Sequence, residues 1–183
     1  LWKNDKFLAS QGKKMDKVYL EKGFYPAKPS DQPEWVKEVG FGRQSVALTL
    51  ENCYDDWCMS ILAKELGKED DYQYYLNRAY NYRNVFDSKS GFMRPKTADG
   101  KWIEPFDPIW SGGQGGRDFY TENNGWNYTW YVLHDPQGLI NLMGGQEPFV
   151  AKLQQMFETN VPLYKKYDFL KQYPDMKIGR AHV

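Results

Sequence analysis

Apolar residues recur at the spacing of an α-helix in several segments of this chain, and no segment alternates as a half-buried strand would. The clearest helical segment begins at Ser45, a residue type that caps helices, and ends at Gly67. Its apolar positions are Leu50, Tyr54, Trp57, Cys58, Ile61, Leu62 and Leu66. The next segment begins at Asp70 and Asp71 and keeps the same spacing to Phe86. Because only a short turn separates the two segments, we expect an antiparallel helical hairpin.

Weaker patterns predict the remaining helices. A first helix ends at Gly23 and carries the apolar residues Leu8, Met15, Val18 and Tyr19. A fourth helix covers about 123–133, and Pro136 begins a further helical segment. Pro148 begins the fifth helix, whose buried stripe would consist of Phe149, Leu153, Met156 and Phe157. The predicted fold class is therefore all-α.

Residues 87–118 contain glycines, prolines and single aromatic residues in place of a helical pattern. The aromatic side chains Phe92, Trp102, Phe106 and Trp110 would be costly to leave in water, so we expect this long loop to be packed. If consecutive helices run up and down, this loop and the loop before Ser45 lie on one face, where loops on a rigid scaffold commonly carry a binding site. Five helices are too few to close a helical barrel, so we expect this chain to be part of a larger helical domain.

Composition narrows the classes of function. The 24 Lys and Arg residues are balanced by 24 Asp and Glu residues, so no positive field favours a nucleic-acid partner. No apolar stretch approaches the roughly 20 residues of a membrane span. Aromatic residues make up 17% of the chain, which suits either a helical core or a cleft in which sugars stack.

The two ends of the sequence indicate that the chain is a fragment of a longer protein. The sequence begins at Leu1 without an initiator methionine, and a common short-read sequencing adapter can encode residues 177–183. We therefore expect 1–176 to be part of a catalytic domain and 177–183 to be a non-native tail that does not contribute to the fold. The alternative is a natural tail.

Glu122 is the strongest candidate for chemistry, because it is a single carboxylate among aromatic residues. An acid in apolar surroundings tends to stay protonated until it donates, which is the property of a general acid. The alternative interpretation is structural: Glu122 could be an acid in the first turn of a helix or, with Thr121, part of a capping arrangement.

Asp56, His134 and their neighbours offer further candidates. Asp55 and Asp56 fall in the middle of a predicted helix, where a buried carboxylate needs a cation, a hydroxyl-rich ligand or an arginine such as Arg83. His134 could position a substrate, whereas Asp135 is explained more simply as a helix cap. With only two histidines in the chain, a His-based zinc site is disfavoured.

Several motifs resemble glycoside hydrolase family 92. Residues 120–135 read Tyr-Thr-Glu-Asn-Asn-Gly-Trp-Asn-Tyr-Thr-Trp-Tyr-Val-Leu-His-Asp, and 138–145 read Gly-Leu-Ile-Asn-Leu-Met-Gly-Gly. The runs at 49–51, 54–57 and 91–95 also fit that family, in its order, and the resemblance spans about 19–176. It implies an exo-acting, calcium-dependent, inverting α-mannosidase. It also implies that the chain is part of an (α/α)6 barrel catalytic domain, which a β-sandwich domain normally precedes.

The resemblance also implies roles for particular residues. Glu122 matches the general acid, and Trp126 and Asn127 match positions expected near the sugar. We further expect Asp56 and His134 to bind substrate. The usual motif reads Thr-Glu-Gly-Asn-Ala-Trp-Gln, so this chain has glycine at position 125 where the family has alanine.

The resemblance implies that the general base comes from a downstream aspartate motif that is not found in this sequence, so we expect the chain alone to be inactive. The expected substrate is a mannose-containing glycan. The expected cofactor is Ca²⁺, with ligands mostly outside the chain, and the expected location is secreted or periplasmic. Two alternatives remain: a non-catalytic carbohydrate-binding or scaffold segment, and a different (α/α)6-barrel glycosidase.

Overall fold

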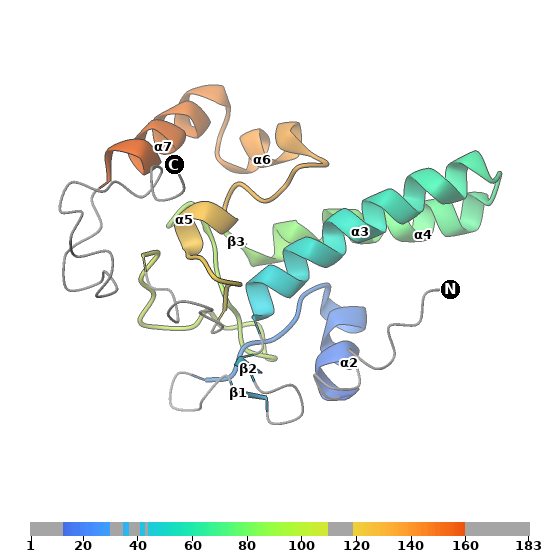
Figure 1. Ribbon diagram of the computed structural model, residues 1–183, viewed down its shortest axis with the longest axis horizontal. Helices are drawn as coiled ribbons and strands as arrows, with labels where there is room; N and C mark the ends of the chain where they lie inside the picture. The colour runs from blue at the N-terminus through green and yellow to red at the C-terminus, as the bar shows by residue number, and fades with distance from the viewer. Residues whose placement is uncertain (1–12, 30–34, 37–40, 43, 110–118, 160–183) are drawn as a thin grey trace.

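Helices make up most of the structure, a computed structural model that describes residues 13–29, 35–36, 41–42, 44–109 and 119–159 (Figure 1). The helices are α2 (Lys13–Lys22), α3 (Ser45–Glu65), α4 (Glu69–Ala79), α5 (Gly125–Tyr128), α6 (Pro136–Leu142) and α7 (Gln146–Glu158), with a 3₁₀-helix at Tyr80–Val85. The described part also contains two short antiparallel hairpins, β1 (Trp35–Val36) with β2 (Phe41–Gly42) and β3 (Phe86–Asp87) with β4 (Phe92–Met93). The predicted tail at 177–183 and the positions of Leu8 and Trp110 lie outside the described residues.

The predicted hairpin is confirmed: α3 and α4 lie side by side (Figure 1). α3 ends in a Schellman motif, in which the amides of Gly67 and Lys68 donate to the carbonyls of Lys64 and Ala63. Gly67 has a φ of 66°, a left-handed conformation that glycine adopts without steric cost. The first turn of α4 then carries three acidic residues at the positive end of the helix dipole, Glu69, Asp70 and Asp71. This turn makes the two helices antiparallel.

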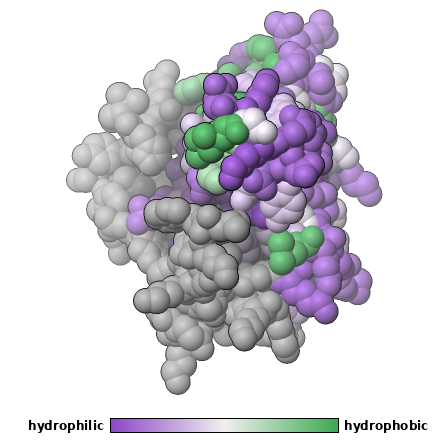
Figure 2. Space-filling model, turned by 90° about the vertical axis from the view of Figure 1, so that its right-hand side faces the viewer, coloured by the Kyte–Doolittle hydropathy of each residue, from purple (hydrophilic) through white to green (hydrophobic). Residues whose placement is uncertain are grey.

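The core lies at the loop end of this hairpin. Val46, Leu50 and Cys53, near the start of α3, are fully buried and pack with Met93 of β4 and with Phe24, Tyr120 and Val132 from the connecting segments. Toward the other end of the hairpin, Ile61, Leu62 and Leu66 are exposed. Figure 2 views this side of the molecule and shows separate hydrophobic patches on a largely hydrophilic surface. Within the described ranges, no helix has both the length and the apolar composition needed to cross a bilayer.

The helix predicted to reach Phe86 is shorter in the structure. It ends at Ala79 and tightens into the 3₁₀-helix, in which residues three apart lie on the same side. This tightening directs Tyr82 and Val85 into the core together, where they are 0% and 1% exposed.

The predicted helices nearer the C-terminus also differ in detail. The helix expected at about 123–133 is reduced to α5, because the chain turns after it and the amide of Val132 donates to the carbonyl of Trp130. Phe157 was predicted to be buried but is exposed, since α7 presents Met156 to the core.

The long loop after β4 is packed against the fold, as predicted. Ile103 is buried and Phe106 is half-buried. The amide of Ala27 donates to the carbonyl of Lys96 at 2.7 Å, which joins this loop to the segment after α2. The described parts of both long connections therefore lie at the end of the hairpin opposite Gly67 (Figure 1), on one face as expected.

We predict that Gly138→Ala destabilises the fold. A β-carbon at Gly138 would overlap the carboxylate of Asp135 and the hydroxyl of Tyr82, which bond to each other. Overpacking of this kind costs about 1–3 kcal/mol. Urea unfolding followed by tryptophan fluorescence measures the effect in the complete protein. Gln137→Ala, at an exposed position of the same helix, is the control; equal stability of the two variants would contradict the prediction.

Candidate functional site

Glu122 lies on the loop that leads into α5, and its side chain is exposed. The cap of α5 is Asn124, whose Oδ1 accepts hydrogen bonds from the amides of Trp126 and Asn127 at 3.0 and 3.3 Å. The interpretation of Glu122 as a capping acid with Thr121 is therefore wrong. The expectation of apolar surroundings for its carboxylate is also wrong, since the carboxylate is accessible to solvent.

The backbone of Glu122 is strained. Its φ is 54°, and Gln44 has the same value. A residue other than glycine in this region costs about 1–3 kcal/mol and persists only where its surroundings enforce it. Here the two strained residues are joined through Thr121, whose hydroxyl donates to Oε1 of Gln44 at 2.6 Å. Strain of this kind is concentrated at functional sites.

The start of α3 holds the same loop, which we call the Glu122 loop (119–124). The amides of Val46 and Ala47 donate to the carbonyl of Phe119 at 3.1 and 3.2 Å. Ser45 was predicted to cap α3 but is its first residue, and no side chain caps the helix. The Phe119 carbonyl replaces a side-chain cap, so helix and loop satisfy each other's polar groups.

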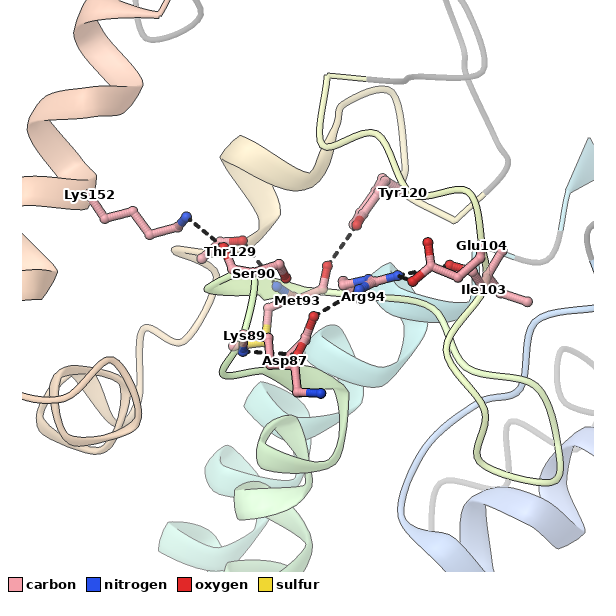
Figure 3. Close-up of polar contacts among 10 residues, drawn as sticks. All are labelled: Asp87, Lys89, Ser90, Met93, Arg94, Ile103, Glu104, Tyr120, Thr129 and Lys152. Carbon is pink, nitrogen blue, oxygen red and sulfur yellow. Dashed lines mark hydrogen bonds and ion pairs between the residues drawn. The ribbon is translucent and has the colours of Figure 1, made fainter.

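β4 anchors the Glu122 loop from the other side (Figure 3). The hydroxyl of Tyr120 donates to the carbonyl of Met93 at 2.7 Å, and the amide of Met93 donates to Oγ1 of Thr129 at 3.2 Å. Thr129 in turn donates to the carbonyl of Gly125 at 2.6 Å. Both polar backbone groups of Met93 therefore bind the segments that flank Glu122.

Arg94 fixes the strand that carries Met93 (Figure 3). Its buried guanidinium donates to Asp87 at 2.8 Å, to Glu104 at 2.6 Å and to the carbonyl of Ile103 at 2.9 Å. Burial alone would raise the pKa of Asp87, but the hydrogen bonds from Arg94 hold that pKa below its ordinary value. Sequence reasoning missed Arg94 as an organising residue, although an arginine in an apolar run signals a buried ion pair.

Gly125 allows the long loop to approach the Glu122 loop closely. A β-carbon at this position would lie 3.1 Å from the hydroxyl of Tyr120 and 3.3 Å from the backbone of Pro108. Both distances are tighter than an ordinary van der Waals contact, so glycine fits this position without displacing its neighbours.

Glu51 is a second acidic residue at this end of α3, and sequence reasoning gave it no role. The hydroxyl of Tyr128 lies 3.5 Å from Oε1 of Glu51 and 3.3 Å from the carbonyl of Thr121, next to Glu122. Burial raises the pKa of Glu51, and the charge of Asp55 raises it further. The spacing of Glu51 and Asp55 by one helical turn was a signal available in the sequence.

The structure gives Trp126 a packing role. The indole is 5% exposed and meets the ring of Phe92 edge-on at 4.8 Å. Lys152 lies over the same pair, with Nζ 3.5 Å from the centre of the Phe92 ring and 5.0 Å from that of Trp126. Burial lowers the pKa of Lys152 to about 8. The indole therefore packs inside the described part of the chain, and Asn127 is half-buried beside it; their predicted positions near the sugar stay predictions.

Asp56 lies in the seam between helices. Its Oδ2 accepts hydrogen bonds from Nε of Arg78 at 2.9 Å and from the hydroxyl of Tyr19 at 3.2 Å. Burial raises the pKa of Asp56, and the charge of Arg78 opposes this effect. The structure thus favours the ion pair over substrate binding for Asp56, although the arginine is Arg78 and not the expected Arg83.

His134 contacts residues of the α3–α4 hairpin and of the 3₁₀-helix. Its Nε2 lies 2.8 Å from the carbonyl of Ala79, and its ring packs beside Tyr54, Trp57 and Tyr82. Burial lowers the pKa of His134, which favours a neutral ring that donates from Nε2. These contacts favour a structural role over the predicted substrate contact. Asp135 caps α6 as predicted, because its Oδ1 accepts from the amide of Gly138 at 2.9 Å.

The described residues contain no group of three or more acidic, histidine or cysteine side chains that could hold a metal ion. The carboxylates of Asp56, Asp87 and Asp135 are paired with arginines. The part of the chain that the structure describes therefore does not fit a complete calcium site, which needs six or more oxygen ligands.

Known proteins resemble this chain over most of its length. Residues 2–179 match the family described as the glycosyl hydrolase family 92 catalytic domain. A protein of Arthroderma benhamiae named an uncharacterized secreted glycosidase is 31% identical, over 87% of this chain and 23% of that protein.

Two solved structures from Bacteroides thetaiotaomicron are also similar. One is the GH92 α-mannosidase BT3965 in complex with mannoimidazole, with a TM-score of 0.67 and 38% identity over 80% of this chain and 18% of that chain. The other is the GH92 inverting mannosidase BT2199, with a TM-score of 0.65 and 36% identity over 90% of this chain and 20% of that chain. The prediction of an all-α chain that forms part of an (α/α)6 barrel is confirmed. This chain spans about a fifth of the length of these relatives.

We predict that Asp56→Asn destabilises the complete protein by about 2 kcal/mol, because it leaves the partly buried Arg78 without its counter-charge. Asp55→Asn is a matched control: the residue next along the helix is exposed, and its substitution should change the free energy of unfolding by less than about 0.5 kcal/mol. Thermal unfolding of both variants tests the assignment. Equal effects would show that the ion pair does not stabilise the helix seam.

Proposed function

Since the chain belongs to glycosyl hydrolase family 92, we propose that it supplies the general acid of an inverting α-mannosidase acting on mannose-containing glycans. The mannosidase activity of the similar Bacteroides thetaiotaomicron proteins supports this proposal. The secreted glycosidase of Arthroderma benhamiae supports a secreted or periplasmic location.

The observation that carries the proposal is the presentation of Glu122. Its carboxylate is exposed, although its backbone is strained and both flanks of its loop are bound to the core. A solvated surface glutamate needs no such support. A proton donor does, because a group within reach of a glycosidic oxygen must be held in one position to act.

In the proposed reaction, the carboxyl group of Glu122 donates its proton to the departing glycosidic oxygen. Water attacks the anomeric carbon from the opposite face, which requires a second carboxylate roughly 6.5–9.5 Å from the first to accept a proton from the water. Among the described acids, Asp56, Asp87 and Asp135 are held by arginines. Because the family resemblance implies a base from a downstream aspartate motif, we propose that the base lies outside this chain and that the chain alone does not turn over substrate.

Calcium dependence is part of the proposal, and the family resemblance supports it. Calcium takes many oxygen ligands at flexible geometry, which suits sugar hydroxyls. We propose that the calcium ligands lie mostly outside the described residues. The proton that Glu122 donates goes directly to the glycosidic oxygen.

Glu122→Gln should abolish most activity of the complete protein on a mannobioside. Gln cannot donate the proton, and general acid catalysis contributes about 10²–10⁴-fold to the rate. Activity on dinitrophenyl α-mannoside should fall much less, since this leaving group departs without protonation.

Glu147→Gln is the control for that experiment, because Glu147 is also exposed but lies in the first turn of α7. Steady-state rates on both substrates measure the effect. Full activity of Glu122→Gln on the mannobioside would remove Glu122 from the reaction. Mannose binding by an inactive wild-type protein would instead favour a carbohydrate-binding segment.

Exhaustive chelation should inactivate the complete protein, and added Ca²⁺ should restore activity where Mg²⁺ does not, because Mg²⁺ demands strict octahedral geometry. Initial rates on a mannobioside, before and after each addition, provide the measurement. Unchanged rates in the chelated protein would contradict calcium dependence and leave the role of Glu122 intact.

A further inference from the structure

The hydroxyl of Tyr128 lies between two acceptors. It is 3.5 Å from Oε1 of Glu51 and 3.3 Å from the carbonyl of Thr121. A hydroxyl has one proton to donate, so Tyr128 cannot serve both acceptors fully. Both distances are longer than the usual 2.7–2.8 Å of such bonds, as expected for a shared proton.

The surroundings of Glu51 favour its neutral form. The groups that face it are Asp55 on its own helix, Tyr128 on α5 and Tyr131 just beyond α5. Burial and the charge of Asp55 raise the pKa of Glu51, the hydrogen bond from Tyr128 lowers it, and no basic side chain of the described part contributes. A protonated Glu51 is a donor as well as an acceptor.

We propose that Glu51 acts through Tyr128 as a positioning residue for Glu122. The protonated Glu51 carboxyl donates to the oxygen of Tyr128, and Tyr128 then donates to the carbonyl of Thr121. When Glu51 is ionised, its charge draws the Tyr128 proton to itself and the Thr121 carbonyl loses its donor. This inference rests on the proposed role of Glu122 as the acid.

We call the hydrogen bonds from Glu51 through Tyr128 to the Thr121 carbonyl the relay. The position of Thr121 explains why the relay affects Glu122. Its side chain is held by Gln44, and its carbonyl belongs to the peptide group that leads into Glu122. With both bonds in place, the strained φ of 54° at Glu122 is enforced from two sides. Without the Tyr128 bond, only the side chain of Thr121 remains held. The relay is complete below the pKa of Glu51 and is lost as the pH rises through it.

The test uses the complete enzyme and two substrates, a mannobioside and dinitrophenyl α-mannoside. Tyr128→Phe removes the relay, so kcat on the mannobioside should fall about 10-fold or more with little change in KM. The loss on the dinitrophenyl substrate should stay within about threefold, because that reaction needs no proton from Glu122. Tyr131→Phe, beside Glu51 but without a bond to Thr121, is the control and should retain kcat on both.

Glu51→Gln provides a second readout. Its uncharged amide donates to Tyr128 at every pH, so kcat on the mannobioside should stay within about threefold of wild type, and the alkaline limb of its pH profile should move to higher pH. In the Tyr128→Phe background, the same substitution should have no further effect.

The outcomes separate this inference from the proposed function. Equal losses on both substrates for Tyr128→Phe, or superimposable pH profiles for Glu51→Gln and wild type, would overturn the inference alone. A complete wild-type protein that hydrolyses neither substrate would refute the proposed function, and the inference with it.

Discussion

The arrangement around Glu122 depends on the backbone of a single strand residue, Met93. Its carbonyl accepts a hydrogen bond from the hydroxyl of Tyr120 and its amide donates to Thr129, so the backbone of one residue fixes the chain on both sides of the candidate acid. Buried backbone groups must be paired, and a two-residue strand leaves few alternatives for that pairing. The same two hydrogen bonds therefore pair the buried polar groups of Met93 and hold the loop that carries Glu122.

The acidic residues around Met93 and Glu122 fall into two groups, those paired with an arginine and those without one. Arg94 holds Asp87 and Glu104, Arg78 holds Asp56, and Arg83 approaches Asp135 at 3.3 Å. The Arg78–Asp56 and Arg83–Asp135 pairs join segments that are distant in the sequence, whereas Arg94 binds residues of its own hairpin and of the loop that follows. Removing one member of a buried pair is costly. Within the described residues no arginine pairs with Glu51, Asp55 or Glu122. Burial and the charge of Asp55 therefore raise the pKa of Glu51 without a cation to oppose them.

Features that depend on residues close together in the sequence could be predicted from it. Helical spacing and Gly67 were enough for the hairpin, because a Schellman turn depends on neighbouring residues only. Asp135 was recognised as a cap for the same reason. The motif predicts Glu122 as the acid, whereas its exposure and its backbone strain depend on the surrounding fold and were not foreseen.

Long-range contacts account for what the sequence did not reveal. α4 tightens after Ala79 because Tyr82 reaches Asp135, a residue far along the chain. The choice of Arg78 over Arg83 as the partner of Asp56 depends on how two helices face each other. Gly125 shows a further consequence of close packing, since its missing β-carbon leaves room for Pro108 and the Tyr120 hydroxyl. A side chain of any size at position 125 would therefore require the long loop to follow a different path, so the shape of that loop is set in part by the absence of a single carbon atom in α5.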